Sequence, residues 1–364
     1  MPSYLLSALE IITGIVLLFG GGELFVKGSV SLSLILGIPQ LVIGLTIVSL
    51  GTSSPELFVS ISSVLKGSDA LAVSNVVGSN IFNILAVLGL SALVLPLKVE
   101  SRLVRRDVPL LLAISAAVWG MSSAGKFTWQ SGVALLIALT INTLWEIRTV
   151  REEPEGMKDA EPDINEEFAS NGLIKSFFYL LAGVLLLAIG SNLLVNGAST
   201  GAAFLGVSEA VIGLTIVSAG TSMPELITSL VAAFRGRTDL AIGNVVGSNL
   251  LNQLLVLGSS AIVSNTKGLQ VDPILIHKDI PIMLIATLAL NPIFWSNGRI
   301  TRTEGSVLVI LYLFYLTDQI LPITLPTLQE EFRLVVFLLI LPAAAIIISF
   351  QSIKYSLYKS KFKS

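Results

Sequence analysis

Long apolar segments recur along the chain and alternate with short polar ones. Each apolar segment runs for roughly 18–25 residues, the length that a helix needs to cross about 30 Å of hydrocarbon. The pattern predicts an all-α polytopic membrane protein with eleven transmembrane helices, at residues 4–31, 39–65, 70–96, 107–123, 128–148, 173–200, 208–234, 239–263, 279–296, 304–321 and 333–352.

Residues 44–93 reappear as residues 213–262. The two segments align without a gap at an offset of 169 positions, and 29 of the 50 aligned residues are identical. Five predicted helices precede the point where the repeat restarts, and an odd number of helices places the two copies in opposite orientations. The sequence therefore predicts two inverted-topology five-helix repeats followed by one extra C-terminal transmembrane helix.

The repeat sets the expected organisation of the chain. Residues 149–172 form the long polar stretch, contain two prolines and many acidic residues, and are predicted to be a cytoplasmic inter-repeat loop. This loop separates a first membrane repeat, residues 1–148, from a second membrane repeat, residues 173–321. Residues 322–364 supply the extra helix and a basic cytoplasmic tail.

Basic residues predict the orientation of the helices. With the N-terminus outside, most of the 22 lysines and arginines, including those of the C-terminal tail, fall on the cytoplasmic side. The positive-inside rule favours this arrangement. We therefore expect a multi-pass protein of the prokaryotic plasma or inner membrane, with the N-terminus outside and the C-terminus in the cytoplasm.

Composition agrees with a lipid environment and narrows the chemistry. The chain is 53% hydrophobic and 13% charged, with a mean hydropathy of +0.86, whereas soluble proteins are nearer to one quarter charged. It has no cysteine, which excludes disulfides, thiolate ligands and cysteine nucleophiles. The single histidine, His277, is interpreted as an interfacial side chain. The net charge of −2 gives no indication of nucleic-acid binding.

Both copies of the repeat contain a proline that must interrupt a transmembrane helix. Residues 51–56 read Gly-Thr-Ser-Ser-Pro-Glu, and residues 220–225 read Gly-Thr-Ser-Met-Pro-Glu. Each proline lacks an N–H and clashes with the carbonyl four residues earlier, so the helix must kink or break there. Carbonyls near Ser49 and Ser218 would then be freed in mid-membrane, where irregular backbone is tolerated only if it is buried in protein or lines a cavity.

The third helix of each half adds further polar groups. Residues 75–83 read Asn-Val-Val-Gly-Ser-Asn-Ile-Phe-Asn and are matched by residues 244–252. Ser79 and Asn83 are four positions apart and share one helical face, as do their counterparts in the second copy. The asparagines on other faces are interpreted as interhelical hydrogen-bond partners; they are Asn75, Asn80, Asn244 and Asn249.

These segments bring together carbonyl, hydroxyl and amide oxygens with the carboxylates of Glu56 and Glu225. An all-oxygen set of this kind selects hard cations such as Ca²⁺ or Na⁺. A protonated acid bonded between helices is the alternative for either glutamate, but two of them, each following a helix-breaking proline, favour a cation site. Glu23 and Lys27, one turn apart, are interpreted as a pair on a helix surface.

These motifs resemble the two α-repeats of the cation/calcium exchanger superfamily, and of the prokaryotic sodium/calcium antiporters in particular. The resemblance rests on G-T-S-S-P-E with G-S-N-I-F-N in the first half and on G-T-S-M-P-E with G-S-N-L-L-N in the second. It implies a ten-helix plan and a set of metal ligands: the backbone carbonyls of Ser49 and Ser218 and the side chains of Thr52, Ser53, Glu56, Ser79, Asn83, Thr221, Ser222, Glu225, Ser248 and Asn252.

Two features depart from the family pattern. Some relatives carry Asp at the position of Asn252, and in the potassium-dependent branch an acid there accompanies K⁺ co-transport, so K⁺ dependence is not expected here. The eleventh helix, residues 333–352, is absent from the ten-helix plan.

The resemblance implies a secondary active antiporter, in which inward Na⁺ drives Ca²⁺ out by alternating access. Proton/calcium exchange remains an alternative, because two glutamates can carry protons as readily as sodium. A cation channel is less favoured, because selectivity filters repeat around an axis along the membrane normal, whereas the two repeats predicted here are antiparallel. No enzymatic activity and no cofactor are expected; the partners are the lipid bilayer and the transported Ca²⁺ and Na⁺, and the oligomeric state is left open.

Overall fold

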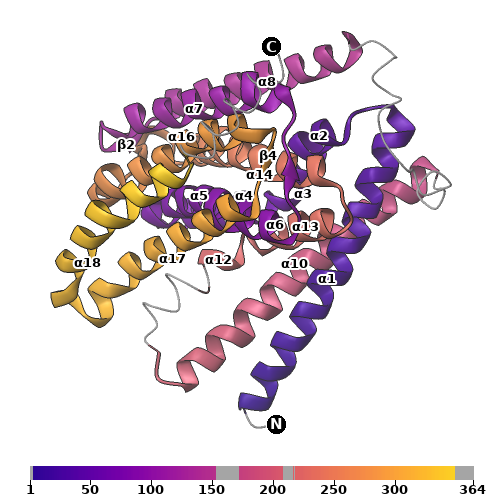
Figure 1. The fold of residues 1–364 in the computed structure, drawn as a ribbon. Coiled ribbons are helices and arrows are strands. Elements are labelled where there is room, and N and C mark those ends of the chain that lie inside the picture. Colours follow the sequence, from indigo (N-terminus) through magenta and orange to yellow (C-terminus); the bar gives the residue numbers. More distant parts are fainter. Residues whose placement is uncertain (1–2, 153–171, 208–215, 217, 349–364) are drawn as a thin grey trace.

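The computed structural model describes residues 3–152, 172–207, 216 and 218–348, and within these ranges the chain is almost entirely helical (Figure 1). Eight of the described helices are long and apolar enough to cross a membrane, and the bent pair at residues 40–65 adds a ninth span when it is counted as one. The all-α membrane fold expected from the sequence is therefore confirmed. The inter-repeat loop at residues 153–171, the basic tail at residues 349–364 and residues 208–215 and 217 lie outside the described residues.

The helices of the first half follow the predicted spans closely. They are α1 (Ser3–Leu36); α2 (Gln40–Ile43), η1 (Gly44–Val48), α3 (Ser49–Thr52) and α4 (Ser54–Leu65); α5 (Asp69–Phe82), η2 (Asn83–Val87) and α6 (Leu88–Val94); η3 (Leu103–Asp107) and α7 (Val108–Ser122); and α8 (Trp129–Glu152). In this half, the η segments are single π-helical turns inserted into longer helices.

The second half repeats this order and ends with the extra helix. Its elements are α10 (Leu173–Phe204); α12 (Ser218–Gly220) and α13 (Met223–Phe234); α14 (Thr238–Leu251), η6 (Asn252–Val256) and α15 (Leu257–Val263); the short turn η7 (Asn265–Lys267); η8 (Leu275–Asp279) and α16 (Ile280–Asn297); α17 (Arg302–Thr324); and η9 (Pro326–Leu328), α18 (Gln329–Val335) and η10 (Val336–Ile340).

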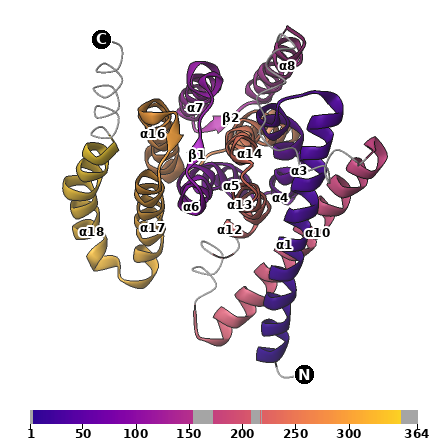
Figure 2. The ribbon, with the colours of Figure 1, turned by 45° about the vertical axis from the view of Figure 1, so that its right-hand side comes forward.

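Helices α1 and α10 occupy equivalent places in the two repeats and cross in opposite directions, side by side at one edge of the molecule (Figures 1 and 2). Gly14 lies against Gly190, whereas Gly28, further along α1, lies against Leu180, earlier in α10. A Cβ atom on Gly14 would approach the backbone of α10 to 2.7 Å, so only glycine permits this separation. The antiparallel contact agrees with repeats of inverted topology.

Two short antiparallel strand pairs join the halves in the same reciprocal way. Strand β1 (Leu97–Lys98) pairs with β4 (Arg299–Ile300), and β2 (Lys126–Phe127) pairs with β3 (Leu269–Gln270). In each pair, the connection after the third helix of one half meets the connection between the fourth and fifth helices of the other half. The pairing therefore fixes the two repeats to each other at two separate points.

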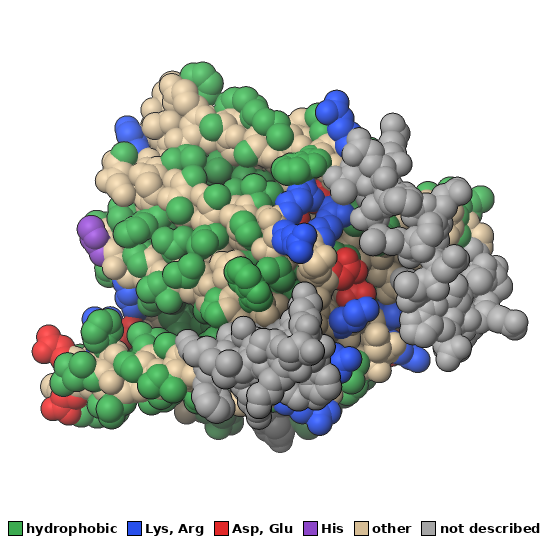
Figure 3. All heavy atoms as spheres, turned by 45° about the horizontal axis from the view of Figure 1, so that its top comes forward, with side chains coloured by type: hydrophobic (Ala, Val, Ile, Leu, Met, Phe, Trp, Pro, Cys, Tyr) green, Lys and Arg blue, Asp and Glu red, His purple; other side chains and the backbone are tan. Residues whose placement is uncertain are grey.

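The third helices of the two repeats form the centre of the molecule. In the most apolar 18-residue stretch of the spans at residues 69–94 and 238–263, 83% and 94% of the residues are buried, compared with 11% in that of residues 302–324. Hydrophobic side chains are spread over the middle of the face drawn in Figure 3, as expected for a surface that contacts lipid. Most polar side chains in the middle of the two central helices are thus removed from both lipid and the aqueous phases.

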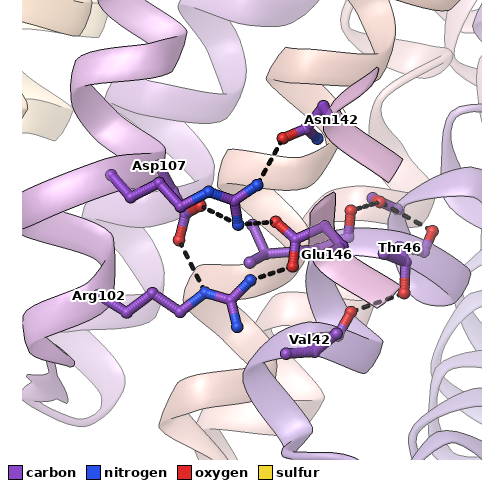
Figure 4. A network of polar contacts seen from close by, with 9 residues as sticks. Val42, Thr46, Arg102, Asp107, Asn142 and Glu146 are labelled. Atoms are coloured by element: carbon purple, nitrogen blue, oxygen red, sulfur yellow. Dashed lines mark hydrogen bonds and ion pairs between the residues drawn. The ribbon is translucent and has the colours of Figure 1, made fainter. Parts of the chain in front are cut away.

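A cluster of charged side chains connects the fourth and fifth helices of the first half (Figure 4). Both Arg102 and Arg106 donate to the carboxylate of Glu146, and the nearest side-chain nitrogens of these arginines lie 3.7 and 3.4 Å from the carboxylate of Asp107. Arg106 also donates to the Asn142 side-chain oxygen at 2.9 Å. Two cations and two anions therefore neutralise one another in a largely buried position.

The second half has a related cluster at the start of its fourth helix. Lys278 lies 2.7 Å from the carboxylate of Asp318 and donates to the side-chain oxygen of Gln319, which in turn donates to Asp279 at 2.7 Å. The second cation comes from α18, where Arg333 donates to Asp318 at 2.7 Å. The extra helix thus completes the charge balance that the first repeat achieves with its own residues.

Replacing Glu146 with Gln is expected to destabilise the protein strongly. The substitution leaves two buried guanidinium groups with one carboxylate, and loss of one partner of a buried ion pair typically costs about 3–5 kcal/mol. Thermal unfolding in detergent should show a lower Tm for this variant. The matched substitution of the exposed Glu331 should leave the Tm nearly unchanged, and equal effects of the two substitutions would contradict a stabilising role of the cluster.

Candidate cation site

The second span bends at the sequence motif that precedes Glu56. Helix α3 ends at Thr52, α4 begins at Ser54, and the two parts meet at an angle of 43°. Pro55 lacks the N–H that would bond to the Gly51 carbonyl, and the Leu50 carbonyl accepts the Ser54 hydroxyl at 2.7 Å. The helix interruption predicted from the proline is therefore present.

The second repeat has the same backbone at the equivalent position. Thr221 and Ser222 separate α12 from α13, and Ser222 has φ −91° and ψ 9°, close to the φ −81° and ψ 3° of Ser53. As a result, Glu56 and Glu225 both lie in the first turn of a twelve-residue helix. The positive end of a helix dipole favours negative charge at that place.

Each of the two glutamates is held by a serine of the opposite repeat. Ser222 donates to Glu56 Oε1 at 2.9 Å, and Ser53 donates to Glu225 Oε1 at 3.1 Å. Both carboxyl groups are fully buried, and the second oxygen of each, Oε2, has no hydrogen-bond partner among the described residues. Two carboxyl groups thus lie in one buried region, each with an oxygen available to a ligand.

Hydroxyl groups of both repeats surround this pair. The Ser222 hydroxyl lies 2.9 Å from the Ser79 hydroxyl, and the Thr52 hydroxyl lies 3.4 Å from the Ser248 hydroxyl. Thr221 donates to Asn75 at 3.2 Å. The structure therefore brings the predicted threonines and serines of the two motifs together from opposite repeats.

Asn75 and Asn244 fix the broken helices in matching ways. Asn75 donates to the Glu56 carbonyl at 3.3 Å and to Ser60 at 3.0 Å, and Asn244 donates to the Glu225 carbonyl at 3.2 Å and to a serine at 2.9 Å. Their side-chain oxygens accept from threonines of the opposite repeat. The interpretation of these two asparagines as interhelical hydrogen-bond partners is confirmed.

Asn83 and Asn252 behave differently from the other asparagines. Both side chains are fully buried, and neither the oxygen nor the nitrogen of either side chain has a partner among the described residues. Each residue begins a π-helical turn, a local widening that is frequent at functional sites. An unpaired buried amide costs about 1–3 kcal/mol, which favours a ligand as its partner.

Two residues of this region were not predicted from the sequence. Gln253, which replaces Ile84 of the first repeat, is fully buried and donates to Asn80 at 3.3 Å. Ser191 of α10 donates to the Gly220 carbonyl, which has lost its helical donor because residue 224 is proline. The signal that could have identified Gln253 is the replacement of an apolar residue in the first repeat by a polar one at the same position of the second repeat.

The two predicted backbone ligands lie at the ends of the broken helices. The Ser49 carbonyl accepts the Ser53 N–H at 2.9 Å and the Thr52 hydroxyl at 3.3 Å, so it faces the motif but is already hydrogen-bonded. Ser218 is the first residue of α12, and its side chain lies outside the described residues.

The expected pairing of Glu23 with Lys27 is replaced by a contact between helices. Glu23 accepts hydrogen bonds from Nε and Nη2 of Arg235 at the end of α13, the shortest at 2.7 Å, while the Lys27 ammonium lies 5.7 Å from the centre of the Tyr179 ring. The spacing of one turn would allow Glu23 to pair with Lys27, but the Arg235 guanidinium can bind the Glu23 carboxylate through two of its nitrogens.

Comparison with known proteins identifies the family. A sequence profile described as sodium/calcium exchanger protein matches residues 6–147 and 175–321. The chain belongs to the sodium/calcium exchanger family. It is 35% identical over 321 residues to the putative antiporter CaxA of Alkalimonas amylolytica, with 85% of this chain and 98% of that protein covered. The sodium/calcium exchanger MaX1 of Methanosarcina acetivorans is 31% identical over 343 residues, with 85% and 97% covered.

The fold of this sodium/calcium exchanger family member matches a solved structure as well. The sodium-calcium exchanger NCX_Mj, soaked with 10 mM Na⁺ and zero Ca²⁺, superposes with a TM-score of 0.72 at 30% sequence identity, covering 85% of this chain and 97% of that one. The chain is thus a multi-span membrane transporter of the cation/calcium exchange type, and the family assignment made from the motifs is confirmed.

Removing either cross-repeat serine is expected to weaken calcium binding. In Ser53→Ala and Ser222→Ala, one glutamate loses its hydroxyl donor, and a hydrogen bond to a charged group is worth about 1.5–3 kcal/mol. The rise in Tm on adding Ca²⁺ to the protein in detergent should therefore require at least about ten-fold more Ca²⁺ in each variant.

The adjacent Ser54→Ala variant provides the matched control. Ser54 is exposed and donates to the Leu50 carbonyl instead of a carboxylate, so its calcium dependence should resemble that of the native protein. Equal calcium dependence of Ser53→Ala and Ser54→Ala would contradict the assignment of Ser53 to the site.

Proposed function

We propose that this protein is a secondary active antiporter that exchanges Na⁺ for Ca²⁺ by alternating access. The observation that carries the proposal is the pair of fully buried glutamates, Glu56 and Glu225, each with one oxygen held by a serine of the opposite repeat and one without a partner. Uncompensated carboxylates in this position are costly, and a bound cation removes the cost. The names of MaX1 and NCX_Mj support sodium and calcium as the ions.

The proposed ligands are oxygens from both repeats around this pair. Carboxylate, hydroxyl and amide oxygens suit Ca²⁺ and Na⁺. The ligand set is the Ser49 and Ser218 carbonyls with the side chains of Thr52, Ser53, Glu56, Ser79, Asn83, Thr221, Ser222, Glu225, Ser248 and Asn252. Ligation through the Ser49 carbonyl would replace its bond from the Thr52 hydroxyl.

Charge balance explains why such a site favours exchange over leak. Two ionised glutamates carry two negative charges, which one Ca²⁺ or two Na⁺ neutralise. The empty site would bury both charges without compensation, and this discourages the empty protein from changing conformation. A third Na⁺, held by neutral oxygens, would make the exchange of three Na⁺ for one Ca²⁺ move net charge.

Proton/calcium exchange is the second candidate. An unpartnered carboxylate oxygen can take up a proton as well as bind sodium, and both Glu56 and Glu225 have one. The discriminating property is the gradient that drives calcium movement. In either case, we place the N-terminus outside and the C-terminus in the cytoplasm of a prokaryotic cell membrane, because the positive-inside rule favours that orientation.

Glu56→Gln and Glu225→Gln are each expected to abolish calcium transport, since each removes one of the two charges that balance Ca²⁺. The measurement is uptake of ⁴⁵Ca²⁺ into proteoliposomes under an imposed Na⁺, K⁺ or H⁺ gradient. The native protein should take up calcium under the Na⁺ gradient at more than about ten times the rate of either variant, the change that corresponds to 1.4 kcal/mol.

Glu331→Gln is the control, because Glu331 is exposed and lies outside the two repeats; its uptake should equal that of the native protein. Uptake driven equally well by a proton gradient in sodium-free buffer would favour the second candidate. Full transport by both glutamine variants at residues 56 and 225 would remove the site assignment.

Exchange of three Na⁺ for one Ca²⁺ is expected to respond to membrane potential. Each elementary charge that crosses the membrane contributes about 2.3 kcal/mol per 100 mV. The proteoliposomes contain sodium in the lumen, and calcium enters from outside. A potassium diffusion potential that is positive outside should therefore change the initial rate of calcium uptake. Identical rates at both polarities would contradict a transfer of net charge.

A further inference from the structure

The two repeats are related in sequence but are not in the same arrangement. Gly22 of α1 lies against α13, where an added Cβ atom would come within 2.9 Å of Ile227 and 3.3 Å of Val231. Both of these side chains are buried. The equivalent of Ile227 in the first repeat is Phe58 of α4, and 76% of its surface is exposed. Helix α1 therefore covers a face of α13 whose counterpart on α4 is uncovered.

The same asymmetry applies to charge. Glu23, next to Gly22, forms the bidentate ion pair with Arg235 described above. An offset of 169 places Asn192 of α10 at the equivalent of Glu23, and Lys66 at the equivalent of Arg235. Asparagine carries no charge, so the second repeat cannot form the matching ion pair with Lys66.

In a transporter with inverted repeats, this asymmetry distinguishes the two states of the transport cycle. A transporter built from two such repeats reaches its opposite state when the halves exchange their arrangements. In that state, α10 would cover α4, and Asn192 would approach Lys66, while Glu23 and Arg235 would separate. One of the two states thus contains an ion pair that the other lacks.

We propose that Glu23 and Arg235 are positioning residues that form a latch between α1 and α13 and bias the protein toward the state with α4 uncovered. The proposal rests on transport by alternating access. The latch acts on the balance between the two states without contacting the transported ions. Its two side chains are 47% and 55% exposed, and an exposed ion pair is worth a factor of about two to five in an equilibrium.

The absence of cysteine permits a direct test by distance measurement between spin labels. One label pair, on Val16→Cys and Phe234→Cys, spans α1 and α13. The mirrored pair, on Leu185→Cys and Leu65→Cys, spans α10 and α4. All four native residues are exposed and the two pairs are related by the offset of 169. When the protein converts to its opposite state, the distance within each label pair changes toward the distance that the other label pair has in this structure.

Pulsed electron paramagnetic resonance on the purified full chain should give a different main distance for each pair. In Glu23→Gln and in Arg235→Gln, the population of the minor distance relative to that of the major distance should rise about two- to five-fold in both label pairs. The double variant should show no larger change, because the two residues act as one contact.

Asn192→Glu supplies the reverse test, since it gives Lys66 a charged partner and should shift the ratio in the same direction as Glu23→Gln. Asn192→Gln is the matched control and should leave it unchanged. Equal main distances for the two label pairs, unchanged ratios in Glu23→Gln or Asn192→Glu, or equal shifts in Asn192→Gln and Asn192→Glu would each overturn the latch. These distances need no ion gradient, so a failure of Na⁺-driven calcium uptake alone would affect only the proposed function.

Discussion

The burial of two carboxyl groups between the repeats is the constraint on which the rest of the structure depends. Glu56 and Glu225 are fully buried, and an ionised carboxylate in such a place requires hydrogen bonds and a counter-charge. Helix breaks place each glutamate in the first turn of a new helix, and each opposite repeat contributes one serine. Neither repeat alone supplies what its own glutamate needs, so the site requires both halves.

The contacts that hold the two halves together occur in matching pairs, one made by each repeat to the other. Small residues allow close helix contact, as where Gly44 and Gly243 meet with an added Cβ only 3.0–3.1 Å from the opposing Cα. The strand pairs exchange partners between the halves, and Asn75 and Asn244 make matching bonds. Reciprocity in the scaffold makes the departures from it informative, because each one distinguishes the two sides of the molecule.

Sequence reasoning recovered the helices, the duplication and the helix interruption, because apolar length, repeat offset and proline chemistry are local properties. It also placed Ser53 and Ser222 in the region of the glutamates, since the repeat supplies both copies. It did not anticipate the Ser191 bond to Gly220 or the Glu23 contact with Arg235. Both join segments that are far apart along the chain, and neither spacing nor periodicity specifies which side chains meet across helices. The π-helical turns at Asn83 and Asn252 leave no sequence pattern of their own.

The bond from Arg333 to Asp318 has a consequence for the eleventh helix. The first repeat balances its charged cluster with Arg102 and Arg106. When Asp279 is aligned with Asp107, each the last residue of a π-helical turn, the second repeat has Ile274 at the position of Arg102. Because the second cation resides on a later segment, deletion of that segment would leave the carboxylates of Asp279 and Asp318 with Lys278 as the one cation of this cluster. The extra helix is thereby tied to the charge balance of the second repeat, and its removal is unfavourable for the stability of that repeat.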